Sequence, residues 1–201
     1  MICSCCVAIV VAPAATAGEY NTVLNIGDAA PAWSKLPGAD GKEHSLADLA
    51  DKKAVVLVFT CLSCPTAVDY EQRIEKLRKE YGPKGVEVVA VCVNKVKADS
   101  LEAITARVKE KQLGFPYLYD ESQKIAKDYG AIFTPEFYVL DGDRKIAYMG
   151  ALDDKTEADA VQKRYVQDAL DAVLTGKLAP QGEVIARGCR IRYVRERGGT
   201  N

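Results

Sequence analysis

The chain has 201 residues, a net charge of −1 at pH 7 and a hydrophobic content of 48%. This length suits one domain with short appendages, and the hydrophobic content is sufficient for a buried core. The near-zero net charge gives no support to a nucleic-acid or membrane-surface partner. No apolar run approaches the roughly 20 residues that a membrane-spanning helix needs, so we expect no stable membrane insertion.

The N-terminus has features of an export signal. Residues 5–12 are apolar, and Ala15-Thr16-Ala17 has the small-residue pattern of a signal-peptidase site. We therefore expect residues 1–17 to be a signal peptide and the mature protein to be periplasmic or otherwise extracytoplasmic. The basic n-region of a signal is missing, because no Lys or Arg precedes Lys35. The alternative is a cytoplasmic protein with an apolar N-terminus.

The next part of the chain predicts a hairpin followed by a strand–helix–strand unit. Turn-forming residues at 38–42 indicate a hairpin tip, and Ser45 is placed to cap a short helical turn. Apolar runs and apolar residues at helical spacing then predict a buried strand at 54–60, a helix at 65–81 and a second buried strand at 86–93.

Predicted helices and strands also alternate in the rest of the chain. Asp99-Ser100 is expected to cap an amphipathic helix that extends to about Lys111. Further patterns predict an extended segment at 115–119, a helix at 121–129, a hairpin of strands at 136–140 and 145–149, and a helix at 157–175. This order predicts an α/β protein with a mixed sheet and helices on both faces.

The motif with the most chemical content is Cys61-Leu62-Ser63-Cys64-Pro65, at the junction of a predicted strand and a predicted helix. A helix start offers unpaired backbone N–H groups and a positive dipole end, which stabilise a thiolate. Proline is favoured at the first helical position, so Pro65 makes Cys64 the N-cap residue. We therefore predict that Cys64 is the nucleophile, with a lowered pKa, and that Cys61 is the resolving thiol.

The other cysteines divide into three kinds. Cys3, Cys5 and Cys6 would leave with the signal peptide. Cys92 lies inside a predicted strand and is expected to be a small buried hydrophobic residue. Cys189 lies near the C-terminus and remains, with Cys61 and Cys64, in the set that is relevant to redox chemistry.

Three stretches resemble sequence motifs of proteins with the thioredoxin fold. The resemblance is greater to the redoxin branch, of the alkyl hydroperoxide reductase and thiol-specific antioxidant type. The three stretches are Ile26-Gly27-Asp28-Ala29-Ala30-Pro31-Ala32-Trp33 with Asp40-Gly41-Lys42, the Cys61–Pro65 motif, and the run from Phe115-Pro116-Tyr117-Leu118-Tyr119-Asp120-Glu121 to Ala131-Ile132-Phe133-Thr134-Pro135-Glu136. The resemblance covers roughly residues 25–178.

The resemblance implies a thioredoxin-like fold with an N-terminal hairpin extension, in which Cys64 aligns with the thioredoxin nucleophile. It also implies a cis peptide bond at Thr134-Pro135 that faces the cysteines, so that these two residues form part of a substrate groove. The expected organisation is a redoxin domain at 20–178 and a basic C-terminal tail at 179–201, which contains Cys189.

The predicted function is thiol–disulfide oxidoreduction through Cys64 and Cys61. We expect a protein or small-molecule disulfide as substrate, a thiol as electron donor, and no cofactor or metal.

One alternative is a peroxiredoxin-like thiol peroxidase. A true peroxiredoxin reads P-x-x-x-T-x-x-C, and counting back from Cys64 places Cys61 at the Thr position and Leu57 at the Pro position. The motif therefore argues against peroxidase chemistry.

A further alternative is a copper- or metal-binding protein that uses Cys61 and Cys64. Copper chaperones of this fold use C-x-x-x-C and a distant histidine. Here the cysteine spacing is one residue shorter, and the single histidine, His44, falls in the predicted hairpin.

Overall fold

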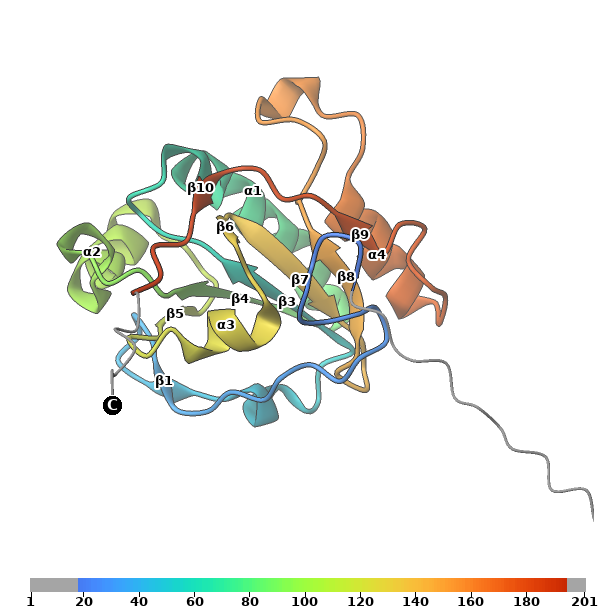
Figure 1. Ribbon diagram of the computed structural model, residues 1–201, viewed down its shortest axis with the longest axis horizontal. Coiled ribbons are helices and arrows are strands. Elements are labelled where there is room, and N and C mark those ends of the chain that lie inside the picture. The colour runs from blue at the N-terminus through green and yellow to red at the C-terminus, as the bar shows by residue number, and fades with distance from the viewer. Residues whose placement is uncertain (1–17, 195–201) are drawn as a thin grey trace, which may run out of the picture.

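The computed structural model describes residues 18–194, and the predicted signal peptide lies outside the described residues. Figure 1 shows a central sheet with helices on both faces. The strands are β1 Leu36–Pro37, β2 Glu43–His44, β3 Ala54–Phe59, β4 Val86–Cys92, β5 Tyr117–Tyr119, β6 Phe133–Thr134, β7 Glu136–Leu140, β8 Ile146–Gly150, β9 Glu183–Val184 and β10 Cys189–Arg190. The α-helices are α1 Pro65–Tyr81, α2 Leu101–Lys111, α3 Lys124–Tyr129 and α4 Tyr165–Leu174, and short 3-10 turns lie at Leu46–Leu49, Gly82–Lys84, Lys97–Asp99 and Ala158–Ala160.

The central sheet has six strands in the order β5-β4-β3-β7-β8-β9. Strands β3, β4 and β5 are parallel to one another, whereas β7 is antiparallel to both β3 and β8. The expected mixed α/β sheet is therefore confirmed. The predicted N-terminal hairpin is also present, as the antiparallel pair β1 and β2.

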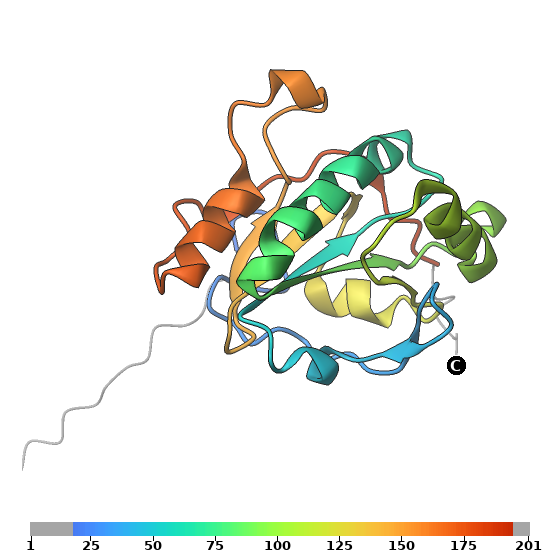
Figure 2. The ribbon, with the colours of Figure 1, turned by 180° about the vertical axis from the view of Figure 1, so that it is seen from behind.

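The two faces of the sheet carry two separate cores. Alternate residues of β3 point to opposite faces, so Val56 and Val58 pack in one core and Leu57 and Phe59 in the other. Helices α1, α2 and α4 contribute to the first core, and α3 covers the second together with the N-terminal segment around Trp33. Figure 2 shows α1 and α4 lying across one face. Because β3 is buried on both faces, its sequence is a continuous apolar run.

Two predicted helices begin later than expected. The helix predicted at 157–175 starts at Tyr165, because Asp154 accepts hydrogen bonds from the backbone N–H groups of Gln162 and Lys163 and so folds the preceding segment into a loop. The helix predicted at 121–129 starts at Lys124, because Asp120 accepts hydrogen bonds from neighbouring backbone N–H groups and forms a turn. Aspartate side chains thus replace a first helical turn in both places.

The segment after α4 returns to the sheet. Strand β9 runs parallel to β8, with Gly150 opposite Val184. The backbones approach so closely that a Cβ atom on Gly150 would lie 1.7 Å from the carbonyl oxygen of Val184, and the φ of Gly150 is +129°. Only glycine fits this position. Among residues 18–194, no helix is long and apolar enough to cross a membrane.

We expect Gly150→Ala to destabilise the protein by about 2 kcal/mol or more, because β9 must separate from β8 to make room for the methyl group. Urea unfolding followed by circular dichroism measures this change. Gly142→Ala is the matched control. Its Cβ would be 3.5 Å from the nearest atom, the carbonyl oxygen of Lys53, and should change stability by no more than about 1 kcal/mol. Equal stability of the two variants would contradict the close approach.

Candidate active site

Cys64 is the N-cap residue of α1, as the position of Pro65 predicted. Its sulfur accepts a hydrogen bond from the backbone N–H of Ala67 at 3.4 Å, and its thiol reaches the carbonyl oxygen of Thr134 at 3.1 Å. Burial opposes ionisation of this sulfur, but hydrogen bonds from Cys189 and from Ala67 outweigh it, so the pKa of Cys64 is lowered. The site therefore favours a thiolate at Cys64.

Cys61 lies just after β3 and has a different environment. Its sulfur is 3.4 Å from the hydroxyl of Thr134 and 3.8 Å from that of Ser63. Burial raises the pKa of Cys61, and the negative charge of Asp99 acts in the same direction against the hydrogen bonds of the two hydroxyls. The pKa values of the two thiols are therefore shifted in opposite directions, upward at Cys61 and downward at Cys64. Both residues are almost fully buried, with exposed fractions of 2% and 0%.

The turn before β7 brings Thr134 and Pro135 to the cysteines. The Thr134-Pro135 peptide bond is cis. Thr134 contacts both sulfurs, through its hydroxyl to Cys61 and through its carbonyl oxygen to Cys64. The predicted proximity of this turn to the two cysteines is confirmed.

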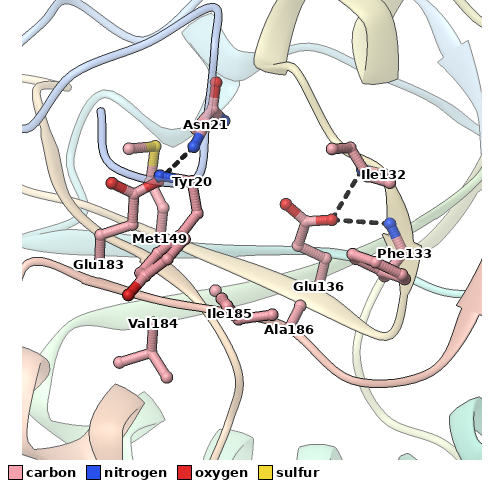
Figure 3. Close-up of a pocket in the computed structure, with 11 residues that line it drawn as sticks. Tyr20, Asn21, Ile132, Phe133, Glu136, Met149, Glu183, Val184, Ile185 and Ala186 are labelled. Carbon is pink, nitrogen blue, oxygen red and sulfur yellow. Dashed lines mark hydrogen bonds between the residues drawn. The ribbon is translucent and has the colours of Figure 1, made fainter. Parts of the chain in front are cut away.

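Glu136 holds the same turn from the other side. One oxygen of its buried carboxylate accepts the backbone N–H groups of Ile132 and Phe133, both at 2.8 Å, as Figure 3 shows. The other oxygen accepts the hydroxyl of Tyr138 at 2.9 Å. Burial raises the pKa of Glu136, although these hydrogen bonds favour its charged form. The carboxylate of Glu136 therefore holds the backbone immediately before Thr134 and helps to position that residue.

A small hollow lies beside this turn. Tyr20 and Glu183 are among the residues that line it with Glu136, and no cysteine does (Figure 3). Its volume of about 40 Å³ is enough for a water molecule but not for a disulfide substrate. The hollow is therefore separate from Cys61 and Cys64.

Sequence reasoning missed the role of Asp99. We expected Asp99-Ser100 to cap α2, but Ser100 alone does so, by accepting the N–H of Ala103. Asp99 is fully buried, and one of its oxygens accepts the N–H groups of Leu62 and Ser63 at 2.8 and 2.7 Å. The available signal was that two cap-forming residues stand in succession where one helix needs a single N-cap.

The second oxygen of Asp99 accepts the hydroxyl of Ser63 at 2.6 Å and the side-chain amide of Asn94 at 3.0 Å. The loop between Cys61 and Cys64 is therefore fixed by one carboxylate that makes four hydrogen bonds. Such a network is stable only when every member is satisfied. Asp99 is thus a positioning residue for both thiols.

The remaining candidates lie apart from this arrangement. Cys92 is fully buried in β4, and burial raises its pKa, which confirms it as a small core residue. His44 is on β2, and its Nε2 lies 3.0 Å from the carboxylate of Asp40. Within the described part of the chain, no group of three or more His, Cys, Asp or Glu side chains could hold a metal ion.

We expect Asp99→Asn to lower stability by about 1–3 kcal/mol, because an amide cannot accept all four hydrogen bonds. Removal of the negative charge should also shift the pKa of Cys61 downward, because that charge raises it. The rate of Cys61 alkylation against pH, followed by mass spectrometry, measures the shift. Ser100→Ala is the control: it removes the α2 cap at a cost of about 1 kcal/mol and should leave Cys61 unchanged. An unchanged Cys61 profile in Asp99→Asn would contradict the electrostatic role.

Comparison with known proteins agrees with this geometry. The Redoxin family profile matches residues 25–164. Thiol-disulfide oxidoreductase ResA of Bacillus thuringiensis is 32% identical over 127 residues, which are 61% of this chain and 68% of ResA. Peroxiredoxin-2 of Macaca fascicularis is 32% identical over 174 residues, which are 81% of this chain and 85% of that protein.

A solved structure extends the similarity to nearly the whole described chain. A hypothetical protein from Sinorhizobium meliloti has a TM-score of 0.80 and 32% sequence identity, with 88% of this chain and 98% of that chain covered. The fold is therefore thioredoxin-like, as the sequence resemblance implied. The chain belongs to the Redoxin family of thioredoxin-like proteins and is an oxidoreductase.

Proposed function

We propose that the protein is a thiol–disulfide oxidoreductase that acts through Cys64 and Cys61. The observation that carries this proposal is the opposite electrostatic setting of the two sulfurs. Hydrogen bonds at the N-terminus of α1 and from Cys189 lower the pKa of Cys64 despite burial, whereas burial and Asp99 raise the pKa of Cys61. A pair with one thiolate and one thiol is suited to sequential attack and resolution.

The reaction proceeds in two exchanges. The Cys64 thiolate attacks one sulfur of a substrate disulfide, forms a mixed disulfide and releases the other substrate sulfur as a thiolate. Cys61 then loses its proton and attacks Sγ of Cys64, which forms the Cys61–Cys64 disulfide and releases the second substrate thiol. Two electrons pass to the substrate, and an external thiol donor returns them to the protein.

Thr134 is suited to assist both steps. Its hydroxyl lies 3.4 Å from the sulfur of Cys61 and can stabilise the thiolate that forms there. Its backbone, with Pro135, is the part of the turn that faces the sulfur of Cys64 and would border a bound substrate. We also propose export of the protein, on the basis of the signal-like sequence at 1–17.

A thiol peroxidase is the second candidate, and the similarity to peroxiredoxin-2 favours it. In that reaction the Cys64 thiolate would attack hydrogen peroxide, become a sulfenic acid and release water, and a second thiol would then form a disulfide with it. The positions that hold Pro and Thr in the peroxide-activating motif hold Leu57 and Cys61 here. This difference favours disulfide substrates over peroxide.

Alkylation should distinguish the two sulfurs. Because the pKa of Cys64 is lowered on folding, its reaction with iodoacetamide should reach half its maximal rate at a lower pH in the native protein than in urea. The midpoint of Cys61 should move the opposite way, because its pKa is raised. Peptide mass spectrometry reads both residues in one sample. A Cys61 midpoint below that of Cys64 would reverse the assigned roles.

The rate of disulfide reduction should depend on Cys64, the proposed nucleophile. With dithiothreitol as donor, we expect Cys64→Ser to abolish reduction of insulin, because the other three cysteines in residues 18–194 all have raised pKa values. Cys92→Ala is the matched control and should retain activity, since Cys92 is buried in β4. Peroxide consumption by the wild type should stay close to that of a simple thiolate, measured with a peroxide electrode. Consumption orders of magnitude faster, with little insulin reduction, would favour the peroxidase.

A further inference from the structure

The C-terminal segment passes directly over the thiol site. Residues 186–193, named the C-terminal strap here, contain β10, which pairs antiparallel with β6. Cys189 stands opposite Thr134, and the hydroxyl of Thr134 donates to the carbonyl oxygen of Cys189 at 3.3 Å. In Figure 1 the strap is the red segment that runs beside β6 and over the start of α1. The strap therefore pairs with the backbone that a substrate strand would otherwise contact.

The strap is anchored on both sides of Cys189. Before it, β9 is part of the central sheet and Ala186 is buried. After it, the N–H of Ile191 donates to the carbonyl oxygen of Ile132 at 2.8 Å, and the N–H of Arg192 donates to the side-chain oxygen of Asn94 at 2.9 Å. The central residues of the strap are therefore held at the site by attachments at both ends.

Cys189 and Cys64 meet at the backbone of Thr134. A Cβ atom on Gly188 would lie 2.0 Å from the carbonyl oxygen of Thr134, and this is the oxygen that accepts the thiol of Cys64. Cys189 follows Gly188 directly and lies near enough to Cys64 for each thiol to shift the pKa of the other, downward at Cys64 and upward at Cys189. Cys189 is exposed, whereas Cys64 and Cys61 are buried. The one sulfur of this group that solvent reaches therefore lies on the strap.

We propose that Cys189 is a third redox-active thiol of this site and transfers oxidation from the buried cysteine pair to the surface. The proposal rests on the proposed function. The Cys189 thiolate attacks Sγ of Cys64 in the Cys61–Cys64 disulfide. The Cys64–Cys189 disulfide forms, the Cys61–Cys64 bond breaks, and Cys61 leaves as a thiolate that takes up a proton. No external oxidant is needed, because the step exchanges one disulfide for another.

The oxidation state of Cys64 controls when Cys189 reacts. In the reduced site, the hydrogen bond to Cys64, burial and the charge of Cys64 raise the pKa of Cys189 to about 11. Cys189 is then a thiol and a poor nucleophile. Once Cys64 is in a disulfide, it has no thiolate, so both the hydrogen bond to that thiolate and its charge cease to raise the pKa of Cys189. Cys189 ionises more readily at the moment when its target disulfide exists.

The exposure of Cys189 gives the electron donor a point of attack. A donor thiolate attacks Sγ of Cys189 and releases the Cys64 thiolate. A second donor thiol then attacks the donor–Cys189 mixed disulfide, which yields the donor disulfide and free Cys189. Two donor thiols thus supply the two electrons, and the donor never needs to reach the buried sulfurs.

Glutathione disulfide is a suitable probe, with Cys61→Ser as the starting variant. In Cys61→Ser, Cys64 becomes glutathionylated and Cys189 then resolves it, which forms the Cys64–Cys189 disulfide. In Cys61→Ser/Cys189→Ser, the glutathione adduct on Cys64 persists. After acid quenching and alkylation, non-reducing peptide mass spectrometry should find about tenfold or more adduct in the double variant, because Cys189 is held beside Cys64 at a high effective concentration.

Cys61→Ser/Arg190→Ala is the matched control, since it changes the neighbouring strap residue and keeps the thiol. It should form the Cys64–Cys189 disulfide as Cys61→Ser does. Equal amounts of persistent adduct with and without Cys189 would overturn the third thiol and leave the role of Cys64 intact. Absence of any adduct on Cys64 in the double variant would instead overturn the proposed function.

Discussion

The carbonyl oxygen of Thr134 is the point on which the site depends. It accepts the thiol of Cys64 at 3.1 Å, and the backbone of Gly188 passes against it. Three segments that are far apart in sequence therefore meet at one atom: the start of α1, the turn before β7 and the C-terminal strap. Because an N-cap residue must sit at the end of its helix, the position of α1 on the sheet also fixes the position of this meeting point.

A network of buried polar groups connects the strap to the loop between the two cysteines. The side-chain amide of Asn94 donates to Asp99, which holds the loop between the two cysteines, and the oxygen of the same amide accepts the N–H of Arg192 in the strap. Asn94 is 2% exposed. One buried amide thus connects the loop that carries the thiols to the anchor of the segment that covers them. A displacement of the strap that broke the Arg192 contact would leave the buried oxygen of Asn94 without a partner, which is costly.

Sequence patterns predicted those elements whose own residues determine their structure, such as β3 and α1. The continuous apolar run of β3 and the helical spacing after Pro65 predicted β3 and α1 to within one residue, because burial on both faces and proline at the helix start leave clear marks. The strands β6, β9 and β10 have two residues each and depend on long-range pairing, which leaves no periodicity to read. Asp99 and Asn94 were missed for the same reason, since their partners are distant loops.

The three sulfurs also constrain one another through charge. Cys64 interacts electrostatically with both Cys61 and Cys189, and each of these two has a raised pKa where Cys64 has a lowered one. In such a group the thiols ionise as a coupled set, so a thiolate on one sulfur suppresses ionisation of its neighbours. Cys189 and the N–H of Ala67 at the start of α1 together favour the anion on Cys64. In the proposed transfer to the surface, oxidation removes the charge from Cys64, and the suppression of ionisation that this charge exerts on Cys189 is removed with it.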